Sequence, residues 1–159
     1  MRVYDIISEP WVIHSGFLDK KHFNKRVSEL LISVGLSSQD SRKFPHEFSG
    51  GQRQRIAIAR ALALNPEIII CDEAVSALDV SIQSQIIKLL SDLRDKFSLS
   101  YIFIAHDLPV VKDIADRVIV MKSGEIVEQG DAAKIFSNPN NQYTKDLLKA
   151  SPDITSLLN

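Results

Sequence analysis

The stretch "EIIICDEAVSALD", residues Glu67 to Asp79, decides the fold class of this chain. Its first part, Ile68 to Cys71, is a short unbroken apolar run, the pattern of a strand that is buried on both faces. Two acids, Asp72 and Glu73, end the run. Asp79 is placed to act as the N-cap of a helix, because apolar residues recur at helical spacing after it: Ile82, Ile86, Leu89, Leu90, Leu93 and Phe97.

A second apolar strand, "YIFIA", follows that helix and stops at His106 and Asp107. Strand, helix and strand of these lengths make a βαβ unit, whose strands are parallel and whose crossover is right-handed in nearly all cases. Ligands of open α/β folds bind at the carboxyl edge of such a sheet. The sequence therefore predicts an α/β fold in which Asp72, Glu73 and His106 emerge at one edge.

These three polar residues suit phosphate chemistry. Strand alternation favours different roles for Asp72 and Glu73: Asp72 can hold Mg²⁺ through water, and Glu73 can polarise the water that attacks a γ-phosphate. His106 can contact the γ-phosphate or hold that water in register with Glu73. The alternative is that the acids cap the next helix and that His106 is an ordinary surface side chain.

A second stretch, "EFSGGQRQRIAIARAL" from Glu47 to Leu62, places two glycines at the start of a long helix. Ser49 and Gln52 have the spacing of a capping box, which does not require Gly50 or Gly51. Glycine there increases the entropy lost on folding. Bare amides at a helix N-terminus can approach a phosphate closely, so these four residues fit either a cap or an anion site.

The chain as a whole is predicted to divide into three regions. Residues 1–64 are predicted to be a helical subdomain that ends before Asn65 and Pro66, and residues 65–130 to be α/β core, closing with a hairpin around Ser123 and Gly124. Residues 131–159 are predicted to be a helical tail.

Composition excludes several classes of protein. The 159 residues include 19 basic and 20 acidic side chains, which gives a net charge of -1. The chain therefore lacks the overall excess of positive charge that is typical of a nucleic-acid-binding protein. The single cysteine, Cys71, excludes an internal disulfide and a cysteine-only metal site within this chain. The apolar runs are far shorter than the roughly 20 residues that span a bilayer, so we expect any membrane attachment to go through a partner.

Four motifs in this order resemble those of the ATP-binding cassette (ABC) ATPases: "FSGGQ" the signature, "IIICDE" Walker B with its catalytic glutamate, "SALD" the D-loop and "IAHD" the switch histidine. The resemblance covers nearly the whole chain. It implies a partial P-loop NTPase fold, a helical subdomain plus the C-terminal part of the parallel-sheet core. It also implies that ATP and Mg²⁺ are the ligands. Glu73 and His106 would then be catalytic, Asp72 would contact Mg²⁺ through water, and Asp79 would belong to the D-loop. The ATP of a second subunit would be contacted by Ser49, Gly50, Gly51 and Gln52.

Flanking segments narrow the resemblance. "DIISEPWVIH", "HDLPVVKDIADRVIVMKSGEIVEQG" and "YTKDLLKASP" resemble the ATPases of oligopeptide and dipeptide importers, although Ala74 stands where many members carry proline. The implied partners are a second ATPase subunit, permease subunits at the cytoplasmic face of the membrane and, indirectly, an extracytoplasmic solute-binding protein, with no nucleic acid. The alternatives are an ABC ATPase that acts on DNA or ribosomes, and a non-hydrolytic half that completes a partner's site.

The sequence has no P-loop. That motif, G-x-x-x-x-G-K-[ST], matches at none of the six glycines, Gly16, Gly35, Gly50, Gly51, Gly124 and Gly130. The adenine-stacking and glutamine loops, which precede the helical subdomain in the family, are expected to be missing as well. We therefore expect this chain to be the C-terminal part of a longer ATPase and to be inactive alone. Because Ser49 begins a helix of the helical subdomain and Glu73 ends a strand of the core, we also expect them to lie too far apart for one phosphate to touch both.

Overall fold

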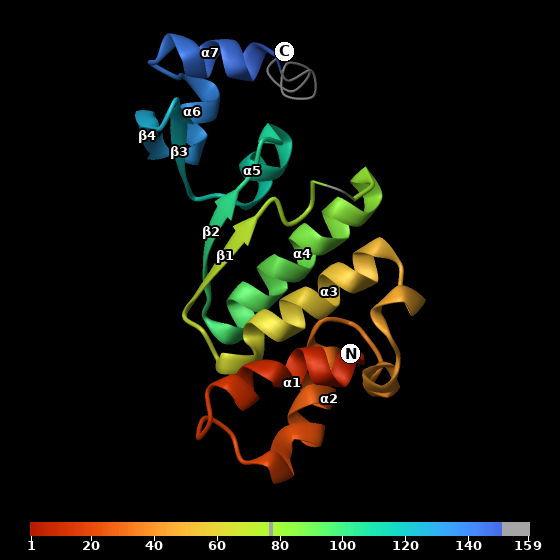
Figure 1. The fold of residues 1–159 in the computed structure, drawn as a ribbon. Coiled ribbons are helices and arrows are strands. Elements are labelled where there is room, and N and C mark those ends of the chain that lie inside the picture. The colour runs from red at the N-terminus through yellow and green to blue at the C-terminus, as the bar shows by residue number, and fades with distance from the viewer. Residues whose placement is uncertain (77, 151–159) are drawn as a thin grey trace. The chain divides into compact units, whose positions relative to one another are not determined.

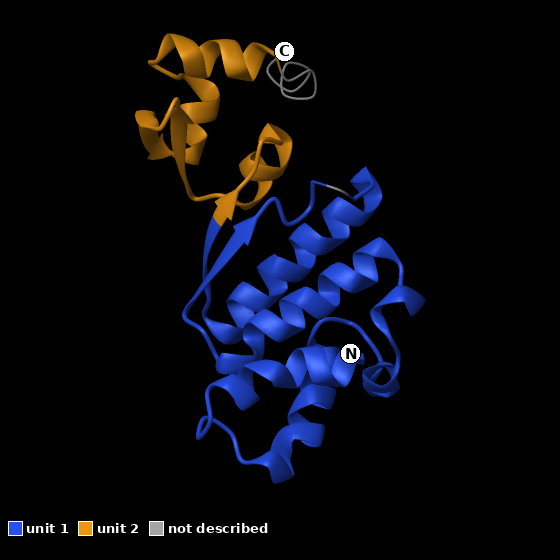
Figure 2. Ribbon diagram, viewed as in Figure 1, with its two compact units in different colours: residues 1–102 blue, residues 103–159 orange. Residues whose placement is uncertain are grey.

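The computed structural model describes residues 1–76 and 78–150. The chain forms two compact units, Met1–Ile102 and a second that begins at Phe103 (Figure 2). The subdomain boundaries predicted after residues 64 and 130 stay predictions.

The first unit opens with helices (Figure 1): α1 (Val3–Ile13), α2 (Phe23–Ser33) and α3 (Gly50–Ala61), joined by the 3₁₀ turns η1 (Lys20–His22), η2 (Ser38–Arg42), η3 (Pro45–Glu47) and η4 (Leu62–Leu64). Trp11 is buried among these helices and contacts two of the other elements. Its ring lies 5.0 Å from that of Phe23, and its Nε1 donates to the carbonyl oxygen of Ala63 at 2.7 Å. The first third of the chain is helical, as the sequence predicts, and Trp11 joins α1 to α2 and η4.

The predicted strand, helix and strand follow as β1 (Ile68–Asp72), α4 (Val80–Phe97) and β2 (Ser100–Ile104). The two strands are neighbours in one sheet and run in the same direction in Figure 1. The Ser100 amide donates to the Glu67 carbonyl oxygen at 2.9 Å, where the pair begins. The fold prediction is confirmed at this unit. Asp79 takes the N-cap position of α4 in an extended conformation, without a side-chain capping bond among the described residues.

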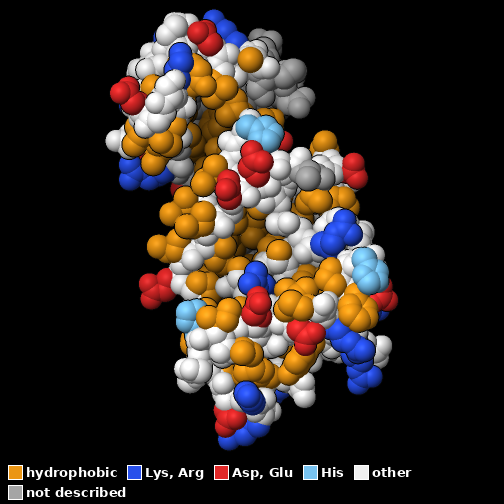
Figure 3. Space-filling model, in the orientation of Figure 1, with side chains coloured by type: hydrophobic (Ala, Val, Ile, Leu, Met, Phe, Trp, Pro, Cys, Tyr) orange, Lys and Arg blue, Asp and Glu red, His pale blue; other side chains and the backbone are white. Residues whose placement is uncertain are grey.

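One part of the strand prediction is wrong: β1 is not buried on both faces. Cys71 is buried, whereas Ile68 and Ile70 are 57% and 65% exposed, and Ile102 on β2 is 52% exposed. Figure 3 shows hydrophobic side chains gathered over these strands. The physical reason is that helices α3 and α4 cover one face, while the described residues put no second layer on the other.

The second unit contains α5 (Leu108–Ile114), the hairpin β3 (Arg117–Lys122) and β4 (Glu125–Asp131), α6 (Ala132–Ser137) and α7 (Gln142–Lys149). Ser123 and Gly124 both have positive φ, 52° and 84°, as a two-residue hairpin turn requires. The strands pair antiparallel with one irregularity after Val120. The predicted hairpin is confirmed, and its inner face packs near a core of Ala132, Phe136 and Leu148.

No helix in residues 1–76 and 78–150 is long and apolar enough to cross a membrane.

Candidate functional site

The start of α3 forms the capping box that the sequence predicts. The Gln52 amide donates to Ser49 Oγ at 3.3 Å, and the Ser49 amide donates to Gln52 Oε1 at 3.0 Å. The box does not involve the amides of Gly50 and Gly51, which occupy the first two helical positions. A capped helix start and an anion site are therefore compatible in this segment.

The double glycine also has a packing reason that the sequence does not reveal. Neither Gly50 nor Gly51 has a positive φ, so conformational freedom is not what selects glycine here. A Cβ on Gly51 would lie 2.6 Å from Cγ2 of Ile82, and one on Gly50 would lie 3.4 Å from Cδ2 of Leu78. The first turn of α3 thus packs directly against the first turn of α4 and the segment before it.

The acids at the end of β1 occupy different backbone conformations. Asp72 is the last residue of the strand and is exposed. Glu73 lies outside the strand in the left-handed region, with φ of 46°, which is uncommon for a residue other than glycine. Strand alternation therefore cannot fix the direction of the Glu73 side chain, although the two acids do differ in setting.

The turn that follows Glu73 is held by four hydrogen bonds to two carbonyl oxygens. The Ser76 amide and hydroxyl donate to the Glu73 carbonyl at 3.2 and 3.0 Å. The Leu78 amide and Gln83 Nε2 donate to the Val75 carbonyl at 3.1 and 3.0 Å. Gln83 on α4 was not among the residues predicted from the sequence. Its only signal was its position one turn into the helix.

A hollow of about 230 Å³ lies beside this turn. Asp72 and Glu73 line it together with Gln54 and Ala57 of α3 and Leu90 of α4. The hollow beside the acids is thus bordered by the middle and end of α3, and Ser49, Gly50 and Gly51 are not among its lining residues.

His106 belongs to the second unit, between β2 and α5. Its neighbour Asp107 caps α5 by accepting the Val110 amide at 3.5 Å. The predicted meeting of His106 with Asp72 and Glu73, like the predicted separation of Ser49 from Glu73, stays a prediction.

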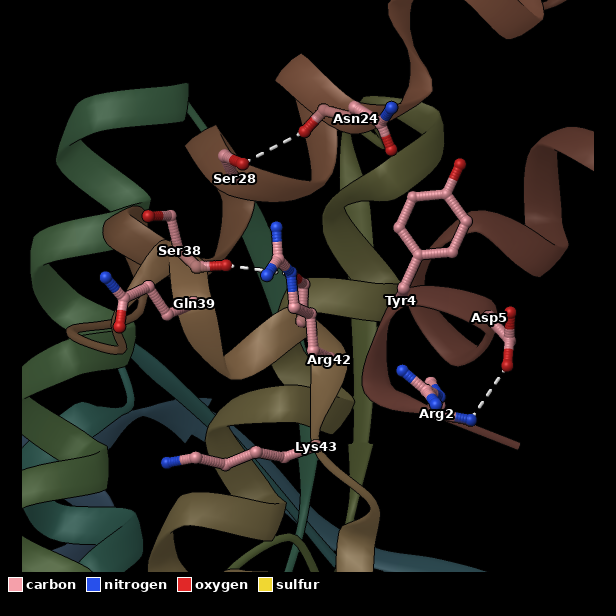
Figure 4. A pocket seen from close by; sticks show the side chains of 10 residues that line it. Arg2, Tyr4, Asp5, Asn24, Ser28, Ser38, Gln39, Arg42 and Lys43 are labelled. Carbon is pink, nitrogen blue, oxygen red and sulfur yellow. Dashed lines mark hydrogen bonds between the residues drawn. The ribbon is translucent and has the colours of Figure 1, made fainter.

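A larger hollow of about 910 Å³ opens among α1, α2 and η2, and none of the predicted site residues lines it. Figure 4 shows its polar lining, which includes Arg2, Tyr4, Asn24 and Arg42. Lys43 at its rim pairs with Asp40 at 2.7 Å, and that hydrogen-bonded carboxylate raises the pKa of the lysine.

The described residues contain no cluster of three or more histidine, cysteine or acidic side chains that could hold a metal ion by itself. Mg²⁺ bound to a nucleotide needs less, because it keeps several waters and takes one or two carboxylates in addition to phosphate oxygens. The exposed carboxylate of Asp72 fits that requirement.

Comparisons with known proteins show what the chain is similar to. A family model described as "ABC transporter" matches residues 3–76. The oligopeptide transport ATP-binding protein OppF of Bacillus subtilis is 53% identical over 96% of this chain and 50% of its own length. OppD of Mycobacterium tuberculosis is 54% identical over 94% of this chain and 24% of its own length. The glutathione import ATP-binding protein GsiA of Shigella flexneri is 56% identical over 93% of this chain and 24% of its own length. The chain thus spans half or less of these relatives.

Solved structures show the same fold. An inward-facing ABC transporter described as metal-chelate type superposes with a TM-score of 0.80 at 26% identity, over 94% of this chain and 58% of that one. The dimeric bacterial ABC transporter cassette MJ0796 superposes with a TM-score of 0.69 at 31% identity, over 83% of this chain and 57% of that one. The capped glycine helix, the acid-ended strand and these likenesses lead to one conclusion: over nearly its whole length the chain is similar to part of an ABC transporter ATP-binding cassette, and its relatives include peptide-import ATP-binding proteins.

Proposed function

We propose that this chain forms the signature and Walker B part of an ATP-hydrolysing subunit that powers an ABC importer of peptides. The observation that carries the proposal is the 53% identity to OppF over 96% of the chain, a stretch that includes every predicted site residue. The local geometry supports it, because a helix with bare amides at its start and a strand that ends in two acids are what ATP binding and hydrolysis need.

The proposed roles divide between two subunits. Ser49 Oγ and the amides of Gly50 and Gly51 contact the phosphates of ATP held by a second ATPase subunit. Glu73 orients and polarises the attacking water, His106 holds that water in register, and Asp72 contacts Mg²⁺ through water. Mg²⁺ itself neutralises phosphate charge when bound. Asp79 ends the D-loop at the start of α4.

The division between subunits is supported by where the residues lie on the chain's own elements. Ser49 caps the start of α3, whereas Glu73 follows the end of β1 beside a hollow lined by the middle of α3. A phosphate at one place serves a different nucleotide from a water at the other. ATP binding then closes two cassettes, and closure drives permease subunits at the cytoplasmic face of the membrane, with peptides delivered by an extracytoplasmic binding protein.

The test is ATP hydrolysis by the complete cassette that carries this chain. Glu73→Gln is expected to leave ATP binding intact and to slow hydrolysis by about 10²–10⁴-fold, the usual contribution of a positioned acid or base. Glu67→Gln, at the opposite end of β1, is the matched control and should hydrolyse at the normal rate. Undiminished hydrolysis by Glu73→Gln would return Glu73 to the helix-capping interpretation.

The 159-residue chain by itself is expected to hydrolyse no ATP, because it has no P-loop to cradle the phosphates. Turnover by the purified chain, free of contaminating ATPase, would overturn this part of the proposal.

A further inference from the structure

The backbone at Glu73 is in a conformation that needs support. A non-glycine residue in the left-handed region is strained and persists only where its surroundings over-determine it. Glu73 has φ of 46°, at the point where β1 gives way to the turn. The backbone that carries its side chain therefore depends on whatever holds the residues immediately after it.

Two of the supports are local. The Ser76 amide and hydroxyl both donate to the Glu73 carbonyl oxygen, which closes the turn on itself. Val75 lies inside this turn with its side chain 2% exposed, so it anchors the turn by burial. Local bonds of this kind can form in any orientation of the turn relative to the rest of the molecule. Something outside the turn must set that orientation.

Gln83 provides the external support. Its Nε2 donates to the Val75 carbonyl at 3.0 Å, across eight residues of sequence, and its side chain is partly buried. Gln83 stands on the first turns of α4, a helix held in the core by Ile86, Leu90 and Leu93. Its neighbour Ile82 packs so closely on Gly51 of α3 that a Cβ there would clash. The start of α4 is thereby fixed against a second helix, and Gln83 transmits that position to the turn.

We propose that Gln83 is a positioning residue for Glu73: its hydrogen bond to the Val75 carbonyl holds the turn so that the Glu73 carboxylate faces the attacking water. The inference rests on the proposed role of Glu73 in hydrolysis. A displacement of about 1 Å at a reacting group can lower a rate about 100-fold, so a single bond of this kind has a measurable effect on turnover.

The structural part is tested on the 159-residue chain itself by amide hydrogen exchange. Gln83→Met keeps the length of the side chain and removes the donor. We expect the Ser76 and Leu78 amides to exchange about tenfold faster in this variant, because the turn opens locally more often. Gln85→Met, on an exposed position of the same helix, is the matched control and should leave these rates unchanged. Unchanged exchange in Gln83→Met overturns the inference whatever happens to hydrolysis.

The catalytic part is tested in the complete cassette. Gln83→Met is expected to lower kcat about 10–100-fold with the KM for ATP unchanged, because the chemical step and not nucleotide binding depends on Glu73. Gln83→Lys restores a donor on a flexible stem and should recover most of kcat. Faster exchange with normal kcat, or a loss of kcat that Gln83→Lys does not recover, would reduce Gln83 to a structural residue and overturn the positioning role.

The two proposals fail in distinguishable ways. Normal hydrolysis by Glu73→Gln contradicts the proposed role of Glu73 and with it the catalytic part of the inference, whereas the exchange experiment still decides whether Gln83 holds the turn. Slow hydrolysis by Glu73→Gln together with normal hydrolysis by Gln83→Met contradicts the inference alone.

Discussion

The helical segment 1–64 and the strand pair β1–β2 use their apolar residues differently. In the helical segment a set of large side chains turns inward, and Trp11, Leu30 and Leu31 are almost completely buried. Other apolar side chains there stay on the surface: Val12, Ile13 and Ile32 are 62%, 67% and 62% exposed. On the strands one face is buried against helices, while Ile68, Ile70 and Ile102 are more than half exposed on the other. Helices α1 and α2 pack within the helical segment and α3 packs also against α4, whereas the strands carry apolar residues that nothing in the described chain covers.

This difference indicates what the strands were selected for. Parallel strands occur almost only in sheets that are covered on both faces, and their continuous apolar runs reflect that burial. A run such as Ile68–Cys71 therefore records a two-sided environment, even where the chain supplies one side.

The largest effect is expected at the centre of the helical segment. Trp11→Ala removes a buried ring and the bond from Nε1 to the Ala63 carbonyl, and should lower the free energy of unfolding by about 3–5 kcal/mol. Trp11→Phe, which keeps most of the ring volume, should cost clearly less. Urea denaturation followed by circular dichroism measures both. Equal, small losses would mean that this core is not self-sufficient and would break the comparison.

The next effect separates the two faces of β1 by thiol chemistry. Burial raises the pKa of the Cys71 thiol from its ordinary 9.0 to about 11. At pH 8 the reactive thiolate is then about a hundredfold scarcer than at an ordinary cysteine, and access is restricted as well.

Iodoacetamide labelling followed by mass spectrometry tests this difference. Cys71 should label slowly in the folded chain. It should label at the rate of an ordinary cysteine once the chain is unfolded in urea. A cysteine introduced as Ile70→Cys, in a Cys71→Ala background, should label quickly in the folded chain. Similar rates at both positions would show that the faces do not differ.

A smaller effect tests why α3 begins with glycine. Gly51→Ala forces a Cβ to within 2.6 Å of Ile82 unless the helices shift, and overpacking of this kind costs about 1–3 kcal/mol. The double variant Gly51→Ala, Ile82→Ala should be destabilised by less than the sum of the single variants. Thermal unfolding of all four proteins completes the cycle. Strict additivity would remove packing as the reason for glycine and leave the phosphate explanation alone.

Sequence patterns predicted the elements and their order, because each depends on local residues. Helical spacing predicts α4, the capping box predicts the start of α3, and Ser123 with Gly124 predict the hairpin turn. The patterns did not reveal that Ile82 limits the space at Gly51, that Gln83 bonds the Val75 carbonyl, or that Glu73 lies in the left-handed region. These features depend on how two helices and a strand end meet, and such contacts leave no periodic signal in the sequence.

The smallest expected effect lies on the open face, and it is the sharpest test of the comparison. Ile70→Thr keeps a β-branched side chain, so strand propensity is retained, while apolar area that is already 65% exposed becomes partly polar. The isolated chain should lose at most about 0.5 kcal/mol in urea denaturation, as surface substitutions usually do. Its tendency to self-associate should fall, because exposed apolar patches promote aggregation, and sedimentation velocity would show this as less oligomer. In the complete cassette the same change should cost more, about 1–2 kcal/mol, if a second layer covers this face. A large loss in the isolated chain would mean that Ile70 is already packed, and the two regions would then not differ as described.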